Sequence, residues 1–483
     1  MRNQFGLLPL PLPVAGQSIS GNEVLGVRSP YSGEQIAEVA TASVGDALNA
    51  VHAAHASLTH EMPAWRRAEV LDAAARLVEA RADHIAELMV GEVAKPIRLA
   101  RIEVQRAADT FRFSADEARR LSGSGLPLDA AKAGVGMTGF TVPGPVGVVG
   151  GIIPFNFPAV LTAHKLGPAI AAGCPIVLLL SNKAPLAALA LTQCAIDAGL
   201  PADRVSVLVG DPGPLAEVLL TDDRVRLISF TGSAGVGWGL QRRAQRKRVL
   251  LELGNMSPIV VCADGDVVAA ARAAAIGGNL FAGQSCISVQ RLVVDSRIAE
   301  EFEDALLDEI RRLRFGDPSD PATDLGPMIT QTATQRMATL IGEAEKQGGV
   351  QLTGGLGGDG HLRPTVLRDV DPAMEVWSKE AFAPLLSMRT FDDLQDAFAL
   401  ANKTEMAIHA SIFTRDIGTA MDAVRAFDFA GVIVNEGPSF RVDQMPYGGI
   451  RGGGNTKEGP HYAVEEMTLQ KLVAIRSVGA KSS

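Results

Sequence analysis

Hydrophobic residues recur at three- and four-residue spacing through much of the N-terminal quarter of the chain. Residues 44–88 are rich in alanine and keep this helical period, as in Val70-Leu71 followed by Ala74-Ala75. A second region with the same pattern covers residues 99–121. Residues 122–143 lose the period and are rich in glycine, serine and threonine. We predict two helical regions followed by an extended arm or hairpin.

From Val146 onward, short apolar runs alternate with helical stretches. Residues 185–198 and the segment after Phe230 are helical in pattern. Strands that alternate with helices predict crossover connections and a parallel sheet covered on both faces, with ligands bound at the carboxyl ends of the strands. The predicted strands are Val146–Ile153, Pro175–Leu180, Val205–Val209, Arg226–Phe230 and Val249–Leu253.

The second half of the chain repeats this alternation and predicts a second α/β unit. Its strands are expected at Gln290–Val294, Pro384–Thr390, Ala410–Phe413 and Gly431–Val434, and its helices at 298–313, 329–347, 392–402 and 416–427. Residues 134–164 contain no Asp, Glu, Lys or Arg, but prolines and glycines interrupt them. That stretch predicts buried strands and tight turns, and it is a poor membrane helix.

Composition limits the classes of function. With 483 residues, 47% hydrophobic, the chain can form two or three domains. The net charge of -9 argues against nucleic acid as a main partner. The basic run Arg242–Arg248 is therefore interpreted as a solvated helix face that leads into a strand.

The cysteine and histidine pattern excludes two further classes. The four cysteines are widely spaced without a CxxC pair, which favours a reducing cytoplasm, and no zinc-type spacing is present, so no metal is expected. The N-terminal segment MRNQFGLLPLPLPV is broken by three prolines and makes a poor signal peptide. We expect a cytoplasmic protein with neither a membrane nor a nucleic-acid partner.

Three stretches carry candidate chemistry. The segment Pro154–Pro158 directly follows a strand, and the glycine loop Phe230–Gly237 lies between a strand and a helix. Backbone N–H groups at such a helix N-terminus can hold a pyrophosphate, although the order G-x-x-G-x-G also suits a simple tight turn. Cys286 follows Gly283-Gln-Ser and is either an inert buried thiol or a nucleophile. Glu252 stands inside an apolar run, where a carboxylate is costly unless it is paired or functional.

Together these stretches resemble the aldehyde dehydrogenase superfamily over nearly the whole chain. The resemblance continues through later motifs in the order typical of the family. These are Glu380-Ala-Phe-Ala-Pro384, Ser411-Ile-Phe-Thr414, Met445-Pro-Tyr-Gly-Gly449, Glu458-Gly and Glu466-Met-Thr468. It implies an α/β fold with a Rossmann-like cofactor domain, an α/β catalytic domain and a small β oligomerisation arm.

The resemblance also implies a mechanism. Cys286 would attack the aldehyde carbon, and the Asn156 amide with the Cys286 backbone N–H would hold the oxyanion of the thiohemiacetal. Hydride transfer to NAD or NADP would leave a thioester, which Glu252 would hydrolyse by deprotonating water. Because members that acylate coenzyme A generally lack this glutamate, Glu252 favours a free carboxylic acid as product.

The same resemblance assigns the cofactor site. Glu380 would hold the nicotinamide ribose with Phe382 near the ring, and Ser233 would contact the pyrophosphate. The other expected contacts are Ile153, Pro154, Phe155, Ser181, Asn182, Phe230, Thr231, Gly232, Val236, Leu253 and Gly254.

One segment departs from the family. Members usually carry Lys-Pro-Ser-Glu after the second strand, where lysine and glutamate bind the adenosine ribose, and this chain reads Leu179-Leu-Ser-Asn182. Losing the acid removes a barrier to a 2′-phosphate, but losing the lysine removes a cation that could hold it. Lys183 is a possible substitute. The preference between NAD and NADP stays open. The alternative to an active dehydrogenase is a cofactor-impaired homologue that acts as a binding or structural subunit.

The segment Phe440–Gly449 resembles the branch that handles lactaldehyde and small phospho-, phosphono- or sulfo-aldehydes. Arg441, Arg106 and Arg112 are candidates to face an anionic substrate, and a surface or interdomain salt bridge is an equally acceptable interpretation of each. The sequence does not choose between them.

The family architecture implies domain boundaries. The cofactor domain would comprise residues 1–122 and 144–252, and the catalytic domain residues 253–436. Residues 123–143 and 465–483 would form the oligomerisation arm. Since such arms pair with a neighbouring subunit, a homodimer or homotetramer is expected, with a small-molecule aldehyde as the other partner.

Overall fold

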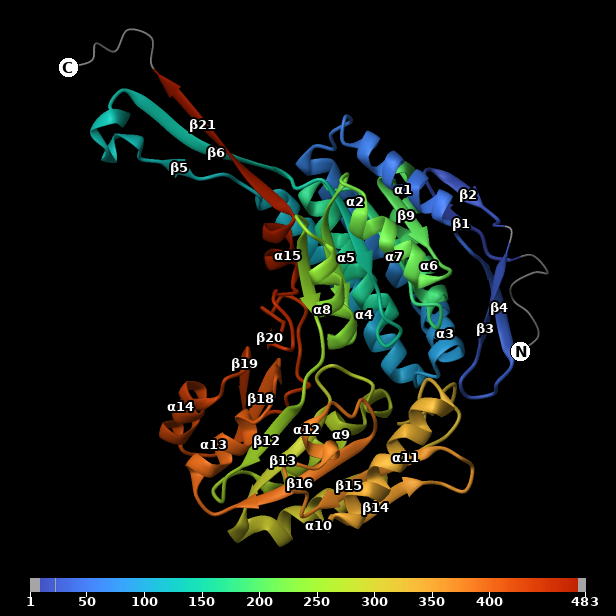
Figure 1. Cartoon of the computed structure of the whole chain (residues 1–483), viewed down its shortest axis with the longest axis vertical. Coiled ribbons are helices and arrows are strands. Elements are labelled where there is room, and N and C mark those ends of the chain that lie inside the picture. Colours follow the sequence, from blue (N-terminus) through green and yellow to red (C-terminus); the bar gives the residue numbers. More distant parts are fainter. Residues whose placement is uncertain (1–8, 22, 477–483) are drawn as a thin grey trace.

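Two separate β-sheets and a projecting arm organise the chain (Figure 1). The computed structural model describes residues 9–21 and 23–476. Residues 1–8 of the N-terminal segment, and residues 477–483 at the end of the expected arm, lie outside the described residues. Within the described part of the chain, no helix is long and apolar enough to cross a membrane.

The first sheet is parallel and has the strand order β11-β10-β7-β8-β9. Its strands are β7 (Val148–Ile152), β8 (Ile176–Leu179), β9 (Val205–Leu208), β10 (Val225–Thr231) and β11 (Arg248–Glu252). All five were predicted from the sequence to within a few residues. Because the chain runs from β7 outward to β9 and then returns to β10, the helices of the two halves cover opposite faces.

The predicted helical regions exist, but the first is divided. It forms α1 (Val44–Ser57), α2 (Ala64–Ala80) and α3 (Ala82–Val93), while the second forms α4 (Ile97–Arg120). The first sheet also carries α5 (Pro158–Ala172), α6 (Pro185–Asp197), α7 (Pro212–Thr221) and α8 (Ala234–Arg243). The interpretation of residues 134–164 as strands and turns alone was wrong after Pro158. Proline at the first position of a helix breaks nothing, since that N–H has no partner within the helix.

The second sheet has seven strands in the order β14-β15-β16-β13-β12-β18-β19, all parallel except β14. The predicted strands are β13 (Val289–Asp295), β16 (Leu385–Phe391), β18 (His409–Phe413) and β19 (Gly431–Val434). The sequence analysis missed β12 (Ser257–Val261), β14 (Val350–Leu356) and β15 (Leu362–Arg368). Pro258 lies inside the central strand β12, where the ladder register shifts, and proline there argues against a strand.

Helices cover both faces of the second sheet. One face packs against α9 (Val267–Asn279) and α10 (Ala299–Arg312), and the other against α11 (Gln331–Lys346), α13 (Leu394–Asn402) and α14 (Ile417–Ala426). The four predicted helices 298–313, 329–347, 392–402 and 416–427 correspond to α10, α11, α13 and α14. The α/β fold class is confirmed.

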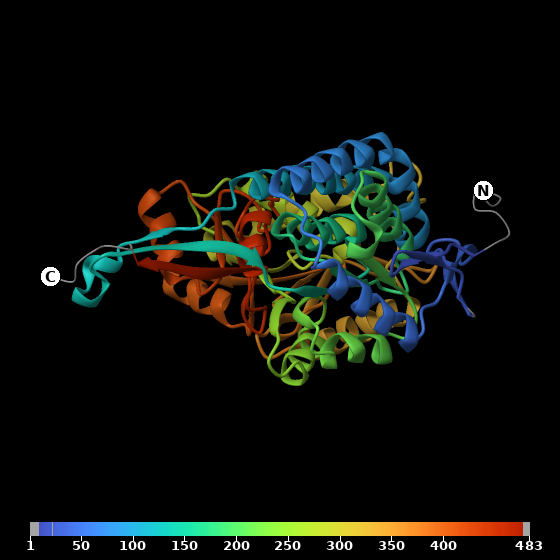
Figure 2. The same cartoon turned by 90° about the horizontal axis from the view of Figure 1, so that it is seen from above.

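The arm is a three-stranded antiparallel sheet that extends away from both α/β units (Figures 1 and 2). It consists of β5 (Gly125–Leu126), β6 (Met137–Pro145) and β21 (Thr468–Arg476). The predicted hairpin therefore pairs with the C-terminal strand in continuous register from Thr468 opposite Pro145 to Arg476 opposite Met137. Short N-terminal hairpins, β1–β2 (Leu12–Val14, Gln17–Ile19) and β3–β4 (Val24–Arg28, Gln35–Ala40), lie at the opposite end of the molecule in Figure 2.

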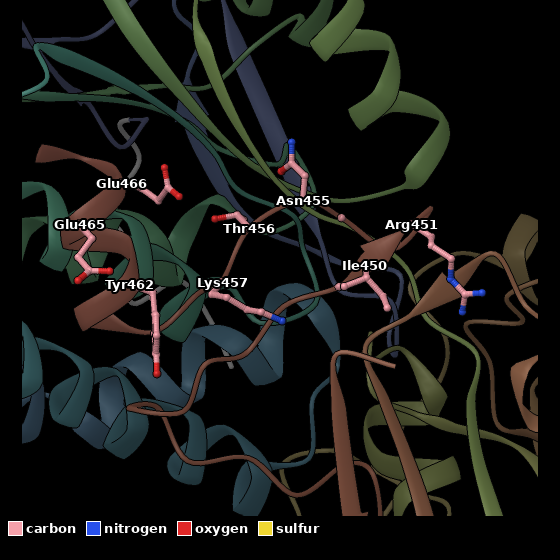
Figure 3. A pocket seen from close by; sticks show the side chains of 10 residues that line it. Ile450, Arg451, Asn455, Thr456, Lys457, Tyr462, Glu465 and Glu466 are labelled. Carbon is pink, nitrogen blue, oxygen red and sulfur yellow. The ribbon is translucent and has the colours of Figure 1, made fainter. Parts of the chain in front are cut away.

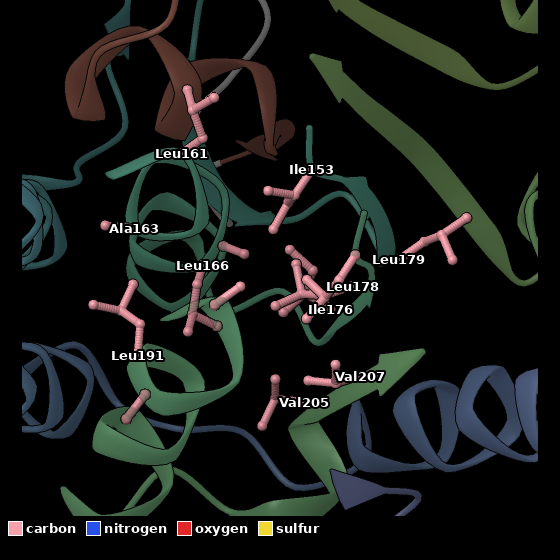
Figure 4. Packing of buried hydrophobic residues seen from close by; sticks show 14 of the residues in the cluster. Ile153, Leu161, Ala163, Leu166, Ile176, Leu178, Leu179, Leu191, Val205 and Val207 are labelled. Atoms are coloured by element: carbon pink, nitrogen blue, oxygen red, sulfur yellow. The ribbon is translucent and has the colours of Figure 1, made fainter. Parts of the chain in front are cut away.

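The largest hydrophobic core surrounds the first sheet. Figure 4 shows side chains of β8 and β9, among them Ile176, Leu178 and Val205, facing Leu166 on α5. Burial of these aliphatic groups fixes the sheet against its helices. The strand ends that lead out of this core are therefore held in place, which matters because the candidate site lies there.

Candidate active site

The carboxyl ends of three neighbouring strands bring the predicted cofactor residues together. In this sheet β7 lies between β8 and β10, and the helices after β7 and β10 cover opposite faces. The strand order therefore reverses at β7, and in open α/β sheets ligands bind in the crevice at such a topological switch point. Ile153–Phe155 follow β7, Ser181 and Asn182 follow β8, and the glycine loop follows β10.

The glycines of the loop at the start of α8 let the helix pack closely on Phe230 and Leu253. A Cβ at Gly232 would lie 2.6 Å from the ring of Phe230, and one at Gly237 would lie 2.4 Å from Leu253. Ser233 is the N-cap and makes no side-chain capping bond, and a Cβ at Gly235 would meet only open space. Val236 is 53% exposed on this first turn. The first backbone N–H groups of α8 are thus left without a side-chain cap, and such a helix N-terminus is the kind of site that binds a pyrophosphate.

The residues expected at the adenosine end make contacts within the protein itself. Leu179 is 2% exposed and belongs to the core. The Asn182 amide donates to the Gly210 carbonyl at 2.8 Å and accepts from the Gly210 N–H at 3.2 Å. Asn182 therefore ties the loop after β8 to the loop after β9. The Lys183 ammonium lies 5.7 Å from the centroid of the Phe155 ring and is the cation of this loop.

Glu380 and Phe382 come from the second α/β unit and contact residues that follow β7 and β11. One Glu380 oxygen accepts from the Asn255 N–H at 3.0 Å, and a Cβ at Gly254 would lie 2.5 Å from the other. Burial raises the pKa of Glu380 to about 7. Phe382 packs edge-to-face against Phe155 with centroids 6.2 Å apart. These contacts join Glu380 and Phe382 to residues that lie far from them in the sequence.

The loop before Cys286 holds an unusual backbone conformation. Phe281, Ala282 and Gly283 all have positive φ, at 49°, 53° and 69°. Left-handed non-glycine residues cost energy and persist only where the surroundings hold them. Gln284 supplies part of that support, because its side-chain oxygen accepts from the Ile329 N–H at 2.9 Å. The loop presents Cys286 in a fixed place ahead of β13.

Cys286 is half-buried and its sulfur lies 2.7 Å from the Tyr447 hydroxyl oxygen. Ile287, Ile408 and the Tyr447 ring pack around it. Loss of solvation raises the pKa of the thiol to about 11, while the Tyr447 hydrogen bond and the nearby Arg441 charge oppose that rise. The other three cysteines are buried and belong to the packing of the two units.

Asn156 lies beside the loop that leads to Cys286. Its side-chain amide donates to the Gln284 carbonyl at 3.1 Å, and an amide group has a second N–H to offer. The Asn156 carbonyl accepts from the Lys95 ammonium at 2.7 Å. Lys95 is in turn paired with Glu103, whose other oxygen accepts from the first N–H groups of α5. A buried ion pair thus fixes the Asn156 segment.

Glu252 ends β11 with a buried carboxyl group. Neither of its oxygens has a hydrogen-bond partner among the described residues. Burial and the neighbouring Glu458 carboxylate raise its pKa well above the ordinary value. A Cβ at Gly448 would lie 2.6 Å from one Glu252 oxygen, so the glycine of the Met445–Gly449 motif leaves room for it. An unpaired carboxyl with a raised pKa suits a general base.

Two more charged side chains, Lys165 and Arg441, lie near Glu252. Lys165 on α5 donates to the hydroxyls of Ser229 (3.0 Å) and Thr231 (2.8 Å). The Thr231 side chain, expected at the cofactor, is therefore directed to Lys165. Glu458 forms an ion pair with Arg441 at 2.9 Å.

The three candidate anion-binding arginines have different surroundings. Arg112 pairs with Glu79 and Asp109 on the surface. Arg106 forms a two-point ion pair with Asp443, with distances of 3.0 and 2.7 Å. Arg441 is buried, contacts His164 at 2.9 Å, and stacks on Tyr447 with its guanidinium carbon 3.7 Å from the ring centroid. Arg441 therefore lies one side chain away from Cys286.

Sequence reasoning missed Lys95, Lys165 and Tyr447. Lys165 had a usable signal, because it directly follows the uncharged stretch 134–164 within an apolar helix. Tyr447 lies in the Met445–Gly449 motif, but the motif alone does not show that its hydroxyl reaches a thiol 161 positions earlier. Lys95 gave no comparable signal.

A pocket of about 360 Å³ lies along the segment after β20 (Ile450–Arg451), lined among others by Asn455, Lys457 and Tyr462 (Figure 3). Cys286 is not among its lining residues. Asn455 instead pairs with Leu251, which braces the strand that ends in Glu252.

Within the described residues, no group of three or more His, Cys, Asp or Glu could hold a metal ion.

Comparison with known proteins agrees with this geometry. The family model described as "Aldehyde dehydrogenase family" matches residues 17–473. The chain belongs to the aldehyde dehydrogenase family. The family resemblance and the assignment as an oxidoreductase of the aldehyde dehydrogenase class are thus confirmed.

Three known proteins are similar to this aldehyde dehydrogenase in sequence or structure over nearly its whole length. A 3-sulfolactaldehyde dehydrogenase from Priestia aryabhattai is 38% identical over 98% of both chains. The crystal structure of aldehyde dehydrogenase 21 from Physcomitrella patens, in complex with the reaction product succinate, has a TM-score of 0.93 at 34% identity and covers 98% of this chain and 99% of that one. The glyceraldehyde-3-phosphate dehydrogenase GapN from Methanocaldococcus jannaschii, complexed with NADP, has a TM-score of 0.90 at 33% identity, covering 94% of this chain and 100% of that one.

Proposed function

We propose that this aldehyde dehydrogenase oxidises a small aldehyde to its carboxylic acid, with Cys286 as nucleophile, Glu252 as general base and Asn156 as oxyanion donor. The observation that carries the proposal is the arrangement around Cys286. The Asn156 amide reaches the loop of the thiol, and the unpaired Glu252 carboxyl is close enough to raise the pKa of the thiol. Glu380 would hold the nicotinamide ribose of NAD or NADP, and the glycine loop would hold its pyrophosphate.

The chain's own groups account for the steps. The Cys286 thiolate adds to the aldehyde carbon, and the second Asn156 N–H with the Cys286 backbone N–H stabilises the resulting oxyanion. When bound, NAD or NADP supplies the hydride acceptor. Glu252 then takes a proton from water, which attacks the thioester carbon. The C–S bond breaks, the sulfur leaves as thiolate and the acid is released.

Turnover of aldehydes tests this function. Purified protein should reduce NAD or NADP in the presence of an aldehyde, and Cys286→Ala should lose at least about a thousandfold in rate, since the covalent route is removed. The buried Cys262→Ala provides a matched control that keeps activity. Absence of turnover over a broad aldehyde panel with both cofactors would contradict the proposal.

For the substrate class, we infer an aldehyde with a negative charge at its far end. The named relatives support this, since sulfolactaldehyde, succinate and glyceraldehyde 3-phosphate are all anionic. Arg441 places a positive charge near Cys286, on the far side of the Tyr447 ring. An anionic aldehyde should therefore show a higher kcat/KM than a neutral aldehyde of equal length. If a neutral aldehyde is used equally well, the inference of an anionic substrate is wrong, and the substrate class is small aldehydes such as lactaldehyde.

For the cofactor, we propose that Lys183 takes the place of the missing lysine near the adenosine. It is exposed beside Phe155, while Leu179 is buried and the Asn182 amide is bonded to Gly210. If Lys183 holds a 2′-phosphate, Lys183→Ala should weaken NADP binding about tenfold and leave NAD binding unchanged, measured by calorimetric titration. Equal effects on both cofactors, or on neither, would contradict this role.

The same titration examines the second candidate, a cofactor-impaired homologue that acts as a binding or structural subunit. The contacts of Leu179 and Asn182 favour it, because Leu179 is a buried apolar residue and the Asn182 amide is already bonded to Gly210. Failure of the wild-type protein to bind either cofactor would support this second function over the first.

We also propose that the sheet units and arm act as the cofactor domain, catalytic domain and oligomerisation arm, with the boundaries given by the sequence. A homodimer or homotetramer would follow from pairing through the arm. A reducing cytoplasm suits an enzyme whose nucleophile is a free thiol.

A further inference from the structure

The Tyr447 phenol is aimed at the nucleophile. Its hydroxyl oxygen lies 2.7 Å from the Cys286 sulfur, and the residue is 2% exposed. Tyr447 belongs to the segment between β19 and β20, 161 positions after the cysteine. A buried phenol normally has a hydrogen-bond partner, and here the thiol is that partner.

Three sets of contacts hold the ring in this orientation. The backbone groups of Tyr447 and Glu458 form an antiparallel bridge. The edge of the ring packs at 84° against His409, with centroids 5.4 Å apart. The Arg441 guanidinium covers one face at 3.7 Å from the ring centroid and is itself anchored by Glu458. The hydroxyl is thus fixed in direction as well as position.

The direction of the hydrogen bond depends on the state of the sulfur. When Cys286 is a neutral thiol, either atom can donate. When Cys286 is a thiolate, it has no proton to give, so only the phenol can donate. Such a bond to a charged acceptor is stronger than the neutral one. Tyr447 therefore stabilises the ionised sulfur more than the protonated sulfur.

The surroundings make this stabilisation necessary. Burial and the carboxylates of Glu458 and Glu252 raise the pKa of Cys286, whereas the Tyr447 hydrogen bond and the Arg441 charge lower it. The pKa of Tyr447 itself lies well above its ordinary value, because the ring is buried beside the thiol. The phenol therefore keeps its proton at working pH and acts as a donor, not as an acid.

We propose that Tyr447 donates the hydrogen bond that stabilises the Cys286 thiolate, and that Arg441 is the positioning residue that holds the phenol ring in place. The inference rests on the proposed function of Cys286 as nucleophile. It operates at two steps. The bond stabilises the thiolate before it adds to the aldehyde, and again when the C–S bond of the thioester breaks and the electron pair returns to sulfur. No proton leaves the phenol at either step.

The decisive experiment measures the thiol without an aldehyde. Iodoacetamide alkylation of Cys286, followed by mass spectrometry of its peptide, is recorded against pH in the wild type, Tyr447→Phe and the control Tyr462→Phe. Tyr447→Phe removes one oxygen and should raise the apparent pKa of the thiol by about one unit, so alkylation at neutral pH slows about tenfold. The control should follow the wild type.

An unchanged or lowered thiol pKa in Tyr447→Phe would overturn the proposal. It would mean that the phenol only fills space or accepts from the thiol. Thermal unfolding of both variants shows whether the fold is intact. Since alkylation needs no substrate, this result is separate from the test of aldehyde oxidation. With an active substrate, Tyr447→Phe should lower kcat and leave KM nearly unchanged, because the hydroxyl bonds the sulfur and not the aldehyde.

Discussion

At the scale of single residues, the surroundings of the Glu252 carboxyl affect both its strength as a base and the stability of the fold. Its carboxyl group is buried without a hydrogen-bond partner among the described residues, and Glu458 lies near it. Burial makes the charged form costly, so the pKa of the carboxyl rises well above its ordinary value. The same rise makes the group a better base near neutral pH and a burden on the stability of the fold.

Glu252→Gln should therefore separate activity from stability. Thioester hydrolysis should fall by at least about a hundredfold, while the first turnover still releases reduced cofactor as a burst. A carboxyl whose pKa is raised in the folded state favours folding at low pH and disfavours it as pH rises. The variant should thus gain thermal stability over the wild type at alkaline pH, with little difference in acid. Calorimetric melting at several pH values checks this, and a variant less stable at every pH would contradict the assigned pKa direction.

At the scale of elements, the loop from Phe281 to Cys286 is a short strained turn between α9 and β13. Gly283 has φ of 69°, and a Cβ there would lie 2.0 Å from the Ala383 carbonyl oxygen. A side chain of any kind at this position must push the loop away from the segment of Glu380 and Phe382. The loop before Cys286 and the segment of Glu380 and Phe382 therefore depend on one another.

A pair of glycine-to-alanine variants tests this dependence. Gly283→Ala should lower the free energy of unfolding by more than about 1 kcal/mol and reduce alkylation of Cys286, because both strain and overlap are introduced. Gly235→Ala, on the first turn of α8 where a Cβ meets open space, should leave stability unchanged or slightly higher. Denaturant unfolding of both variants measures the difference. Equal stability of the two would show that the turn tolerates a side chain.

At the scale of the whole molecule, the arm exposes apolar side chains that none of the elements within residues 9–21 and 23–476 covers. Val142 on β6 and Leu469, Leu472 and Ile475 on β21 are all more than 40% exposed. Apolar groups gathered on one small sheet are typical of a surface that meets another subunit. This supports the proposed pairing of subunits through the arm.

Leu472→Asp should weaken that pairing. A carboxylate buried in a subunit interface is costly, so light scattering should show a smaller particle than the wild type at equal concentration. Ile417→Asp on α14 is the matched control, since Ile417 is 75% exposed on a different surface. Circular dichroism confirms that both variants stay folded. A Leu472→Asp particle of wild-type mass would contradict assembly through the arm.

Local patterns in the sequence determined much of this protein. Apolar runs and helical spacing predicted the five strands of the first sheet and four helices of the second unit, because those signals come from neighbouring residues. The strands with proline or glycine inside them, β12, β14 and β15, escaped this reasoning. The motifs around Asn156, Glu252 and Cys286 indicated the family, which the comparisons confirmed.

Only the tertiary structure decided which groups meet. It directs the Tyr447 hydroxyl to Cys286, binds the Lys95 ammonium to the Asn156 carbonyl, and uses the Asn182 amide to join two loops. It also separates the arginines, leaving Arg112 on the surface and Arg441 beside the nucleophile. Each of these contacts joins positions far apart in the chain or depends on burial. A sequence pattern records which side chains are present, whereas hydrogen bonding, desolvation and charge pairing depend on distances that only the packed fold sets.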